Sequence, residues 1–471
     1  MRTIYTFPPQ EPVTRESESR CVLLLASQDP RTFAFTTSEP PTTAASFAFS
    51  SLTTARPSSL ETAMSDEDVA TGSDVEQDVL DDEPKSILLG IISQLRKGMD
   101  LSRVTLPTFV LEPRSMCERI TDFMSHPELV LGTTKKADPV ARFNDIVTYF
   151  LSGWHIKPKG VKKPYNPVLG EFFRCRWKFE DGSESFYVCE QVSHHPPISY
   201  YFYANPQADI WITGDLRPKS KFLGNSAATI MQGSSKISFK KTWPGEEYFV
   251  TLPNVYARGI LFGSMYLELG DSVVLKCPKS NLVADIEFQT KGYFSGTYNG
   301  IKGKIKRAGM SGDVLYTIGG KWTDSMYTTK GSSSSADKRT IFNAATAQVH
   351  QMITPPEAEQ EEFESRKLWA NVTKALATKN LDAATQEKTA IEDNQRTIVK
   401  ERAAAGIAWE SRFFKPVGED WELRLTNIPD DPKEASAALE KFIFGPPVNP
   451  IHARFWAEPR TSSPSSAARP Q

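Results

Sequence analysis

The chain has 471 residues, with 55 lysines and arginines against 57 aspartates and glutamates, so its formal net charge is −2 at pH 7. This near-neutral balance argues against a general nucleic-acid binder, because such proteins usually carry a basic excess. No apolar run approaches the roughly 20 residues of a membrane-spanning helix. The five cysteines are far apart and form no Cys-x-x-Cys pair, which argues against a zinc cluster and a disulfide framework and predicts a cytoplasmic protein.

The two ends of the chain are predicted to be disordered. Residues 1–63 are rich in Ser, Thr, Pro and Ala without helical or strand periodicity, and an acidic stretch follows them. We therefore expect a disordered, low-complexity and acidic extension over residues 1–84. Met64 opens the acidic stretch, so residues 1–63 are interpreted as a dispensable extension or a misassigned start. The Pro- and Ser-rich residues 447–471 predict a disordered tail.

Residues 85–97 predict a short amphipathic helix. Its apolar residues recur at helical spacing and Gly98 ends it. An ordinary core helix is one interpretation. The other is a movable lid, because the helix follows an acidic, disordered segment rather than a packed element. Residues 85–110 are accordingly expected to be a lid helix and the segment that leads into the main domain.

The middle of the chain predicts helices followed by many strands. Residues 116–123 and 139–154 have 3.6-residue apolar periodicity, which places helices within residues 115–155. From about residue 165 to 330, short runs rich in Val, Ile, Tyr, Phe and Thr alternate with turn signals, and Asp181-Gly182 and Gly270-Asp271 predict hairpin turns. Consecutive antiparallel strands suggest a sandwich or a barrel, and a barrel of ten or more strands would enclose a cavity. Residues 361–378 and 383–405 predict helices within a C-terminal part, residues 355–446.

The most unusual string is Glu-Gln-Val-Ser-His-His-Pro-Pro at residues 190–197. The two prolines cannot donate to a sheet ladder, so a strand must end there and both imidazoles can converge on one ligand. A metal site would need more ligands than Cys189 nearby, and a nucleophile–base pair lacks an orienting acid. Imidazoles that donate to a phosphate need no further ligand. Structural histidines remain the other alternative.

Three further strings carry charge. Lys163 and Asn166 lie in a proline-stiffened segment before the first strand, where a solvated lysine is the ordinary interpretation. Lys388, Glu392 and Arg396 are spaced four apart, so they share one helix face, either as surface ion pairs or as a cationic row. Residues 301–307 alternate lysine and isoleucine, which gives a basic strand face that is either solvated or able to meet an anionic membrane.

Together these strings resemble the oxysterol-binding-protein-related lipid-transfer family. Residues 190–197 match its signature without a mismatch, and residues 162–171 and the Lys-x3-Glu-x3-Arg helix at 388–396 are similar to its other head-group segments. The resemblance implies a mostly β fold with flanking helices: a large, near-closed antiparallel β-barrel over residues 165–330, within a lipid-binding domain of residues 111–446. It also implies a hydrophobic lipid tunnel, an N-terminal helical lid and C-terminal helices.

The resemblance also implies the ligands. Phosphatidylinositol 4-phosphate would be held at the tunnel mouth by the residues Lys163, Asn166, His194, His195, Lys388, Glu392 and Arg396. Residues 99–109, 154–156 and 218–226 look most like the short fungal members that carry phosphatidylserine, whose matching contact positions here are Leu106, Thr108, Val110, Lys163, Asn166 and Ser220.

The expected function is exchange of phosphatidylserine for phosphatidylinositol 4-phosphate between the endoplasmic reticulum and the plasma membrane. The protein would be a monomer at contact sites of these membranes, would touch anionic surfaces transiently, and would use neither a cofactor nor a metal. Sterol exchange is the alternative within the family. A lipid sensor that does not transport, and an enzyme such as a phosphoesterase that uses the paired histidines, are the alternatives outside it.

Overall fold

The computed structural model describes residues 78–79, 82–101, 104, 106–261, 264–292, 296–309, 313–331 and 337–446. The predictions for the extension before residue 78 and for the tail after residue 446 lie outside the described residues. Within the described part of the chain, no helix is both long and apolar enough to cross a membrane.

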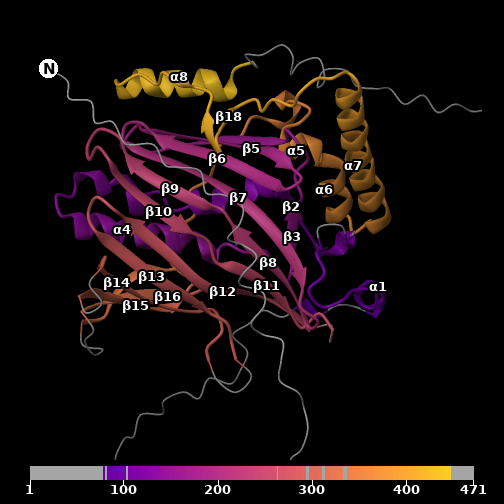
Figure 1. Cartoon of the computed structure of the whole chain (residues 1–471), viewed down its shortest axis with the longest axis horizontal. Helices are drawn as coiled ribbons and strands as arrows, with labels where there is room; N and C mark the ends of the chain where they lie inside the picture. The colour runs from indigo at the N-terminus through magenta and orange to yellow at the C-terminus, as the bar shows by residue number, and fades with distance from the viewer. Residues whose placement is uncertain are drawn as a thin grey trace, which may run out of the picture. The chain divides into compact units, whose positions relative to one another are not determined.

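One 15-stranded antiparallel sheet dominates the fold (Figure 1). From β4 to β17, successive strands or strand pairs lie beside their neighbours in the sequence, so the sheet is a long meander. The first seven strands are β4 (Phe172–Lys178), β5 (Glu184–His194), β6 (Pro197–Asn205), β7 (Ile210–Phe222), β8 (Ser226–Gln232), β9 (Ser234–Phe239) and β10 (Glu246–Thr251). The next seven are β11 (Asn254–Arg258), β12 (Ser264–Cys277), β13 (Leu282–Gln289), β14 (Gly300–Arg307), β15 (Val314–Lys321), β16 (Ser325–Lys330) and β17 (Arg339–Asn343). The fifteenth strand is the two-residue β1 (Asp78–Val79), which pairs with β12.

Two of the long strands are interrupted. β8 and β9 are halves of one return strand beside β7, separated by Gly233, which has a φ of 110°. A Cβ atom there would lie 2.3 Å from the carbonyl oxygen of Asp215, so only glycine fits. β10 and β11 likewise lie end to end beside β12, and Pro253 lies in the two-residue interval between them. These breaks let the long strands bend, and they also hide two strands from the sequence pattern.

Of the two predicted hairpin turns, one is present: Asp181-Gly182 forms the turn between β4 and β5. The other predictions for the sheet need three corrections. Gly270-Asp271 does not form a turn, because both residues lie inside the continuous strand β12, where Gly270 makes room for the ring of Tyr256. The strands β9, β11, β16 and β17 were not predicted. The sheet therefore extends to Asn343, beyond the expected boundary at residue 330.

The sheet curls around the helix α4 (Pro139–Ser152). This helix begins at Asp138, whose side chain accepts a hydrogen bond from the amide of Val140. Its buried face shares one apolar cluster with residues from both halves of the sheet, including Phe173 and Tyr187 at one end and Ile286, Ile301 and Ile318 near the other. A helix packed against both ends of a meander indicates a sheet that is nearly closed, as predicted.

The outer face of β4 to β6 is covered by C-terminal helices. Their apolar residues form a second cluster with side chains of these strands. Val372, Leu439 and Ile443 are its buried members on helices, and Trp369 joins them from the turn between α5 and α6. The elements of this part are α5 (Ser365–Leu368), α6 (Ala370–Ala377), α7 (Leu381–Ala404), the hairpin β18 (Phe414–Val417) and β19 (Asp420–Leu423), and α8 (Pro432–Phe444). The sequence patterns predicted the helices before α8 only, with α5 and α6 as one helix.

The N-terminal helix α1 (Asp82–Ile92) packs against the ends of β7 and β12. Leu88 and Ile92 form a third apolar cluster with Phe222, Ile260 and Met265. Beyond the helix, the amide of Gly98 donates to the carbonyl of Phe222 at 2.7 Å, which adds this segment to the edge of β7. The helix ends at Ile92, earlier than the predicted residue 97. Its role as a lid stays a prediction.

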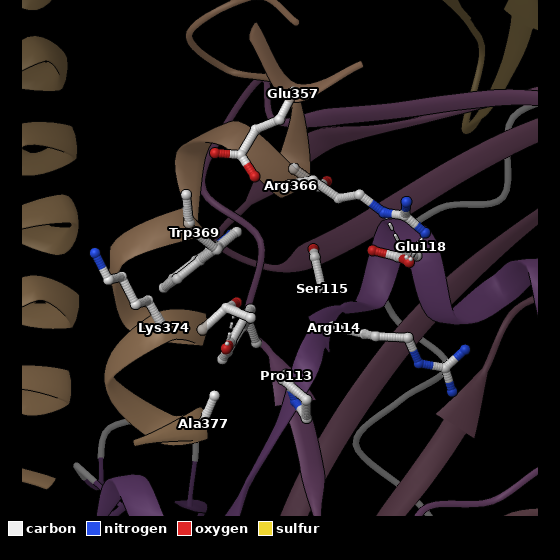
Figure 2. A pocket seen from close by; sticks show the side chains of 13 residues that line it. Pro113, Arg114, Ser115, Glu118, Glu357, Arg366, Trp369, Lys374 and Ala377 are labelled. Carbon is white, nitrogen blue, oxygen red and sulfur yellow. Dashed lines mark hydrogen bonds and ion pairs between the residues drawn. The ribbon is translucent and has the colours of Figure 1, made fainter. Parts of the chain in front are cut away.

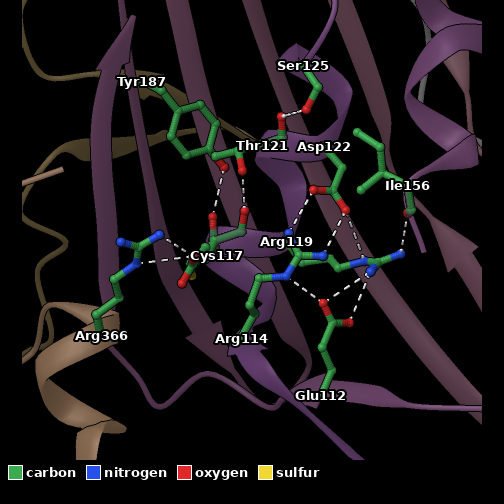
Figure 3. Close-up of polar contacts among 11 residues, drawn as sticks. Glu112, Arg114, Cys117, Arg119, Thr121, Asp122, Ser125, Ile156, Tyr187 and Arg366 are labelled. Carbon is green, nitrogen blue, oxygen red and sulfur yellow. Dashed lines mark hydrogen bonds and ion pairs between the residues drawn. The ribbon is translucent and has the colours of Figure 1, made fainter. Parts of the chain in front are cut away.

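Charged residues fix the short strand β2 (Leu111–Ser115) to the helical segment that follows it (Figure 3). Arg114 donates to Asp122 at 2.8 Å, and Arg119 pairs with the buried carboxylate of Glu112 at 3.0 Å. Arg119 also donates to the carbonyl of Ile156 at 3.1 Å. These contacts immobilise β2, which pairs in parallel with β3 (Lys163–Tyr165) and so sets the position of Lys163.

Candidate functional site

Three of the four strings singled out in the sequence meet around one turn. Lys163 lies on β3, and the turn of residues 166–171 follows it directly. His194 ends β5, and Lys388, Glu392 and Arg396 lie on α7. Segments separated by more than 200 residues are therefore brought to one place, which periodicity alone could not predict.

Four consecutive residues of the turn, 167–170, each bond through the backbone to a different side chain or strand. The bonds are Pro167 O with His194 Nδ1 at 3.2 Å, Val168 N–H to Glu171 Oε2 at 3.1 Å, Leu169 N–H to Gln395 Oε1 at 3.1 Å, and Gly170 N–H to Gln191 O at 2.9 Å. The turn is thus the joint between β5, α7 and the strand it precedes. Its backbone holds the site residues in a fixed arrangement.

His194 has a defined tautomer in this arrangement. The carbonyl oxygen of Pro167 can only accept, so Nδ1 of His194 carries the hydrogen and Nε2 is left free to act. The ring of His195 lies 4.5 Å away, edge to face. Burial, followed by the neighbouring His195, lowers the pKa of His194 below its usual 6.5. The ring is therefore neutral at pH 7 in the unliganded protein.

The pKa of Lys163 is affected by its neighbours on α7. Its side chain is exposed, and desolvation is the largest influence that lowers its pKa from 10.5. The ammonium of Lys388 lowers the pKa of Lys163 further, and the carboxylate of Glu392 opposes it. These influences indicate that Lys163, Lys388 and Glu392, three of the predicted residues, lie close together.

The charged row on α7 is held by Glu392. The ammonium of Lys388 lies 2.5 Å from Glu392, and the side chain of Lys388 is only 16% exposed. Arg396 is 62% exposed, lies 3.8 Å from Glu392 and pairs more closely with Asp393. Both predicted ion pairs are therefore present. The side chain of Arg396 is mostly in water, so it can exchange its exposed carboxylate partners for a ligand.

Of the residues predicted to contact phosphatidylserine, Thr108 contacts α7, and Lys163 and Asn166 lie on β3 and the turn that follows it. Thr108 is buried in η2 (Thr108–Val110), and its hydroxyl lies 3.3 Å from Leu381 O and 3.2 Å from the hydroxyl of Thr385 at the start of α7. Leu106 and Val110 are half-buried. Asn166 is exposed at the turn, and Ser220 lies half-buried on β7, opposite Thr229 of β8.

Two buried carboxylates were not predicted as part of the site. Glu171 accepts hydrogen bonds from the hydroxyls of Ser115 and Ser365 and from the indole of Trp369. Glu190, the first residue of the histidine string, accepts from the hydroxyl of Ser411 and from two backbone amides. Burial raises the pKa of both carboxyls, and the hydrogen bonds oppose that shift. Glutamates inside apolar strand sequences were the available signal, because such acids are buried only with partners.

A separate pocket of about 430 Å³ lies between β2 and α6 (Figure 2). Arg114, Arg366 and Lys374 contribute its positive charge, and Tyr165 and Trp369 line it. It contains none of the seven residues predicted to bind a phosphoinositide. Arg114 and Arg366 are already paired with carboxylates.

The basic strand face of residues 301–307 is largely neutralised by a neighbouring strand. On the basic face of β14, Lys302 and Lys306 pair with Glu287 and Asp285 of β13 at 3.1 and 2.7 Å, so much of its charge is neutralised. Among the residues that the structure describes, no group of three or more His, Cys, Asp or Glu is placed to hold a metal. Cys117, Cys175, Cys189 and Cys277 are buried and unbridged.

Comparison with known proteins decides the family. The sequence profile described as oxysterol-binding protein matches residues 90–374. An oxysterol-binding protein homolog of Schizosaccharomyces pombe is 47% identical over 79% of this chain and 79% of its own length. This chain belongs to the oxysterol-binding protein family. The membership predicted from residues 162–171, 190–197 and 388–396 is therefore confirmed, and the chain is a lipid-transfer protein rather than an enzyme.

Other members of the family extend this result. Oxysterol-binding protein homolog 6 of Saccharomyces cerevisiae is 45% identical over 76% of this chain and 80% of its own length. Oxysterol-binding protein-related protein 5 of Homo sapiens is 39% identical over 77% of this chain but 42% of its own length. The solved Osh1 ORD domain in complex with cholesterol has a TM-score of 0.61 at 22% identity and covers 79% of this chain and 93% of that domain. The Osh3 ORD in complex with PI(4)P, from Saccharomyces cerevisiae, has a TM-score of 0.56 at 24% identity and covers 76% of this chain and 93% of that domain. These structures share the fold.

Proposed function

We propose that this protein exchanges phosphatidylserine for phosphatidylinositol 4-phosphate between two membranes. The observation that carries the proposal is the meeting of Lys163, His194 and the charged row of α7 around one rigid turn.

This arrangement suits a phosphate monoester. A phosphorylated inositol carries close to two negative charges at pH 7 and needs several charge-assisted hydrogen bonds when it leaves water. Lys163 and Lys388 supply ammonium groups, and Arg396 supplies a guanidinium that is mostly exposed. Glu392 keeps the two α7 cations side by side, which offsets their mutual repulsion before the ligand arrives.

A hollow interior would hold the acyl chains. The strand β11 is paired on both sides, yet all five of its residues are only half-buried, including Val255, Tyr256 and Ala257. In a filled barrel, the inward residues of such a strand would be fully buried. Incomplete burial next to the cluster under α1 supports a lipid-sized space there. Two chains of 16–18 carbons, at about 0.8 kcal/mol per buried CH₂, require such a space.

The two lipids would compete for one position. Lys163 and Asn166 belong to both predicted contact sets, so the site can accept one head group at a time. A carrier of this kind moves phosphatidylserine against its gradient when phosphoinositide returns in the other direction. We further propose that the protein acts as a monomer at contacts between the endoplasmic reticulum and the plasma membrane, where it touches anionic surfaces transiently. Its similarity to homolog 6 and to related protein 5 supports the choice of cargo.

Two measurements test the proposal. Mass spectrometry of lipids that copurify with the full chain should detect phosphatidylserine, whereas a sterol would favour the sterol exchanger. Transfer between donor and acceptor liposomes should then require phosphatidylserine on one and phosphatidylinositol 4-phosphate on the other for full rate. Binding of both lipids without transfer would indicate a sensor and would refute exchange.

A further inference from the structure

Gln395 connects the charged helix α7 to the turn of residues 166–171. Its side-chain oxygen accepts a hydrogen bond from the amide of Leu169 at 3.1 Å. Gln395 belongs to none of the predicted contact sets. Its neighbour Arg396 belongs to the proposed phosphoinositide site, and the turn residue Pro167 orients His194 of the same site.

Apart from its packing against α6, which includes a hydrogen bond from Asn371 to Glu387 at 3.1 Å, the helix α7 has few other attachments. Of its 24 residues, only Ala384, in the first turn, is buried. Thr108 contacts the same first turn through Leu381 and Thr385. The second half of the helix is held by Ile391 and Ile398, which pack loosely on the second apolar cluster, and by Gln395 between them. A polar bond gives direction and register that two half-buried apolar side chains do not give.

Helix geometry connects this bond to the charged row. Ile391, Gln395 and Ile398 lie at i, i+4 and i+7, so they form the inward stripe. Glu392 and Arg396 each follow a member of that stripe by one residue and point about 100° to one side. A rotation or a slide of the second half of α7 would therefore displace the charged row relative to His194. The bond of Gln395 opposes both movements.

We propose that Gln395 is a positioning residue that holds α7 in the register needed for the phosphoinositide head group. The inference rests on the proposed function and deepens it, because it makes Gln395 selective. Three phosphoinositide contacts lie on α7, whereas the phosphatidylserine contacts Leu106, Thr108, Val110, Lys163, Asn166 and Ser220 include none on that helix. If α7 loses this register, fewer molecules are able to bind the phosphoinositide, whereas binding of phosphatidylserine is nearly unaffected.

Gln395→Met tests the proposal, because methionine keeps the length and packing of glutamine without its acceptor. Gln386→Met is the matched control: Gln386 lies nine residues earlier, so it faces the opposite side of α7, is exposed, and makes no hydrogen bond among the described residues. Affinities of the full chain are measured with liposomes that contain either phosphatidylinositol 4-phosphate or phosphatidylserine. We expect Gln395→Met to weaken phosphoinositide binding about 3- to 10-fold and phosphatidylserine binding less than about 2-fold.

Two further measurements decide the inference. Hydrogen exchange at the Leu169 amide should accelerate in Gln395→Met and not in Gln386→Met. The effect of Gln395→Met should shrink when Lys388→Ala and Arg396→Ala are already present, because the glutamine works through those side chains. Equal losses for both lipids, additive effects or an unchanged exchange rate would overturn it. If the wild-type protein takes up no phosphoinositide, the proposed function itself fails, whatever the variant does.

Discussion

Binding of phosphatidylinositol 4-phosphate should be coupled to uptake of a proton by His194. The Pro167 carbonyl fixes the hydrogen on Nδ1, so the neutral ring offers only a lone pair at Nε2. A phosphate has no proton to give that lone pair near pH 7.5, and the ring must be protonated before it can donate. Burial and His195 lower the pKa of His194 in the free protein, so the proton is absent there and must come from solvent.

The size of the effect follows from linkage. The pKa of His194 lies below 6.5 in the free protein, and a bound phosphate dianion raises it by opposite charge. Between pH 8 and 7 the free ring stays neutral, and the phosphate, whose second pKa is about 6, stays mostly dianionic. Uptake of one full proton then strengthens binding about tenfold, or about 1.4 kcal/mol, over that interval. We expect the affinity for phosphatidylinositol 4-phosphate to rise about 3- to 10-fold from pH 8 to pH 7.

The assay is a titration of the full chain with liposomes containing phosphatidylinositol 4-phosphate at pH 7 and 8. His194→Gln keeps a side-chain amide donor that does not titrate, so its affinity should be flat over this interval. Lys163 also has a lowered pKa and is retained in the variant, which separates its contribution from that of the histidine. Equal wild-type affinities at the two pH values, or a slope that survives His194→Gln, would refute the tautomer argument.

Three further predictions concern the site and the fold. In a liposome assay, His194→Ala combined with His195→Ala should abolish measurable uptake of phosphoinositide and reduce uptake of phosphatidylserine less. Leu106→Asp should do the reverse, because burying a charge at the tunnel entrance is costly. Equal losses of both lipids in both variants would contradict the division of the site. Burial, with a smaller contribution from a neighbouring histidine, lowers the pKa of His155 to about 4, so the unfolded chain takes up the proton first and stability falls as the pH drops from about 6.5 toward 4. At pH 5 this costs about 1–2 kcal/mol after allowance for partial exposure, and urea unfolding at pH 7.5 and 5 should show the loss in wild type and in His350→Gln but not in His155→Gln.

The sequence predicted the overall fold better than it predicted where individual strands are interrupted or continue. Alternating strands and the signature strings identified the sheet, the flanking helices and the three segments of the site. Gly270-Asp271 was misread because glycine serves two purposes, and here it makes room for Tyr256 rather than forming a turn. The link between Gln395 and Leu169 was not predictable either, because it joins residues 226 apart through a backbone amide that no composition or spacing records.

The structure also shows where the acids of the signature strings lie relative to the groups proposed to bind an anion. A carboxylate pointing at the same phosphate as Lys163 and His194 would weaken binding. Glu190 and Glu171 avoid this, because both are buried and used by protein donors on segments remote in sequence. Each acid holds a strand end or turn in place from the protein interior, beside the residues of the proposed site. A Glu171→Gln variant would then weaken both lipids together, since it loosens the whole turn, whereas Gln395→Met separates them. The contrast between the two variants distinguishes support of the turn from positioning of α7.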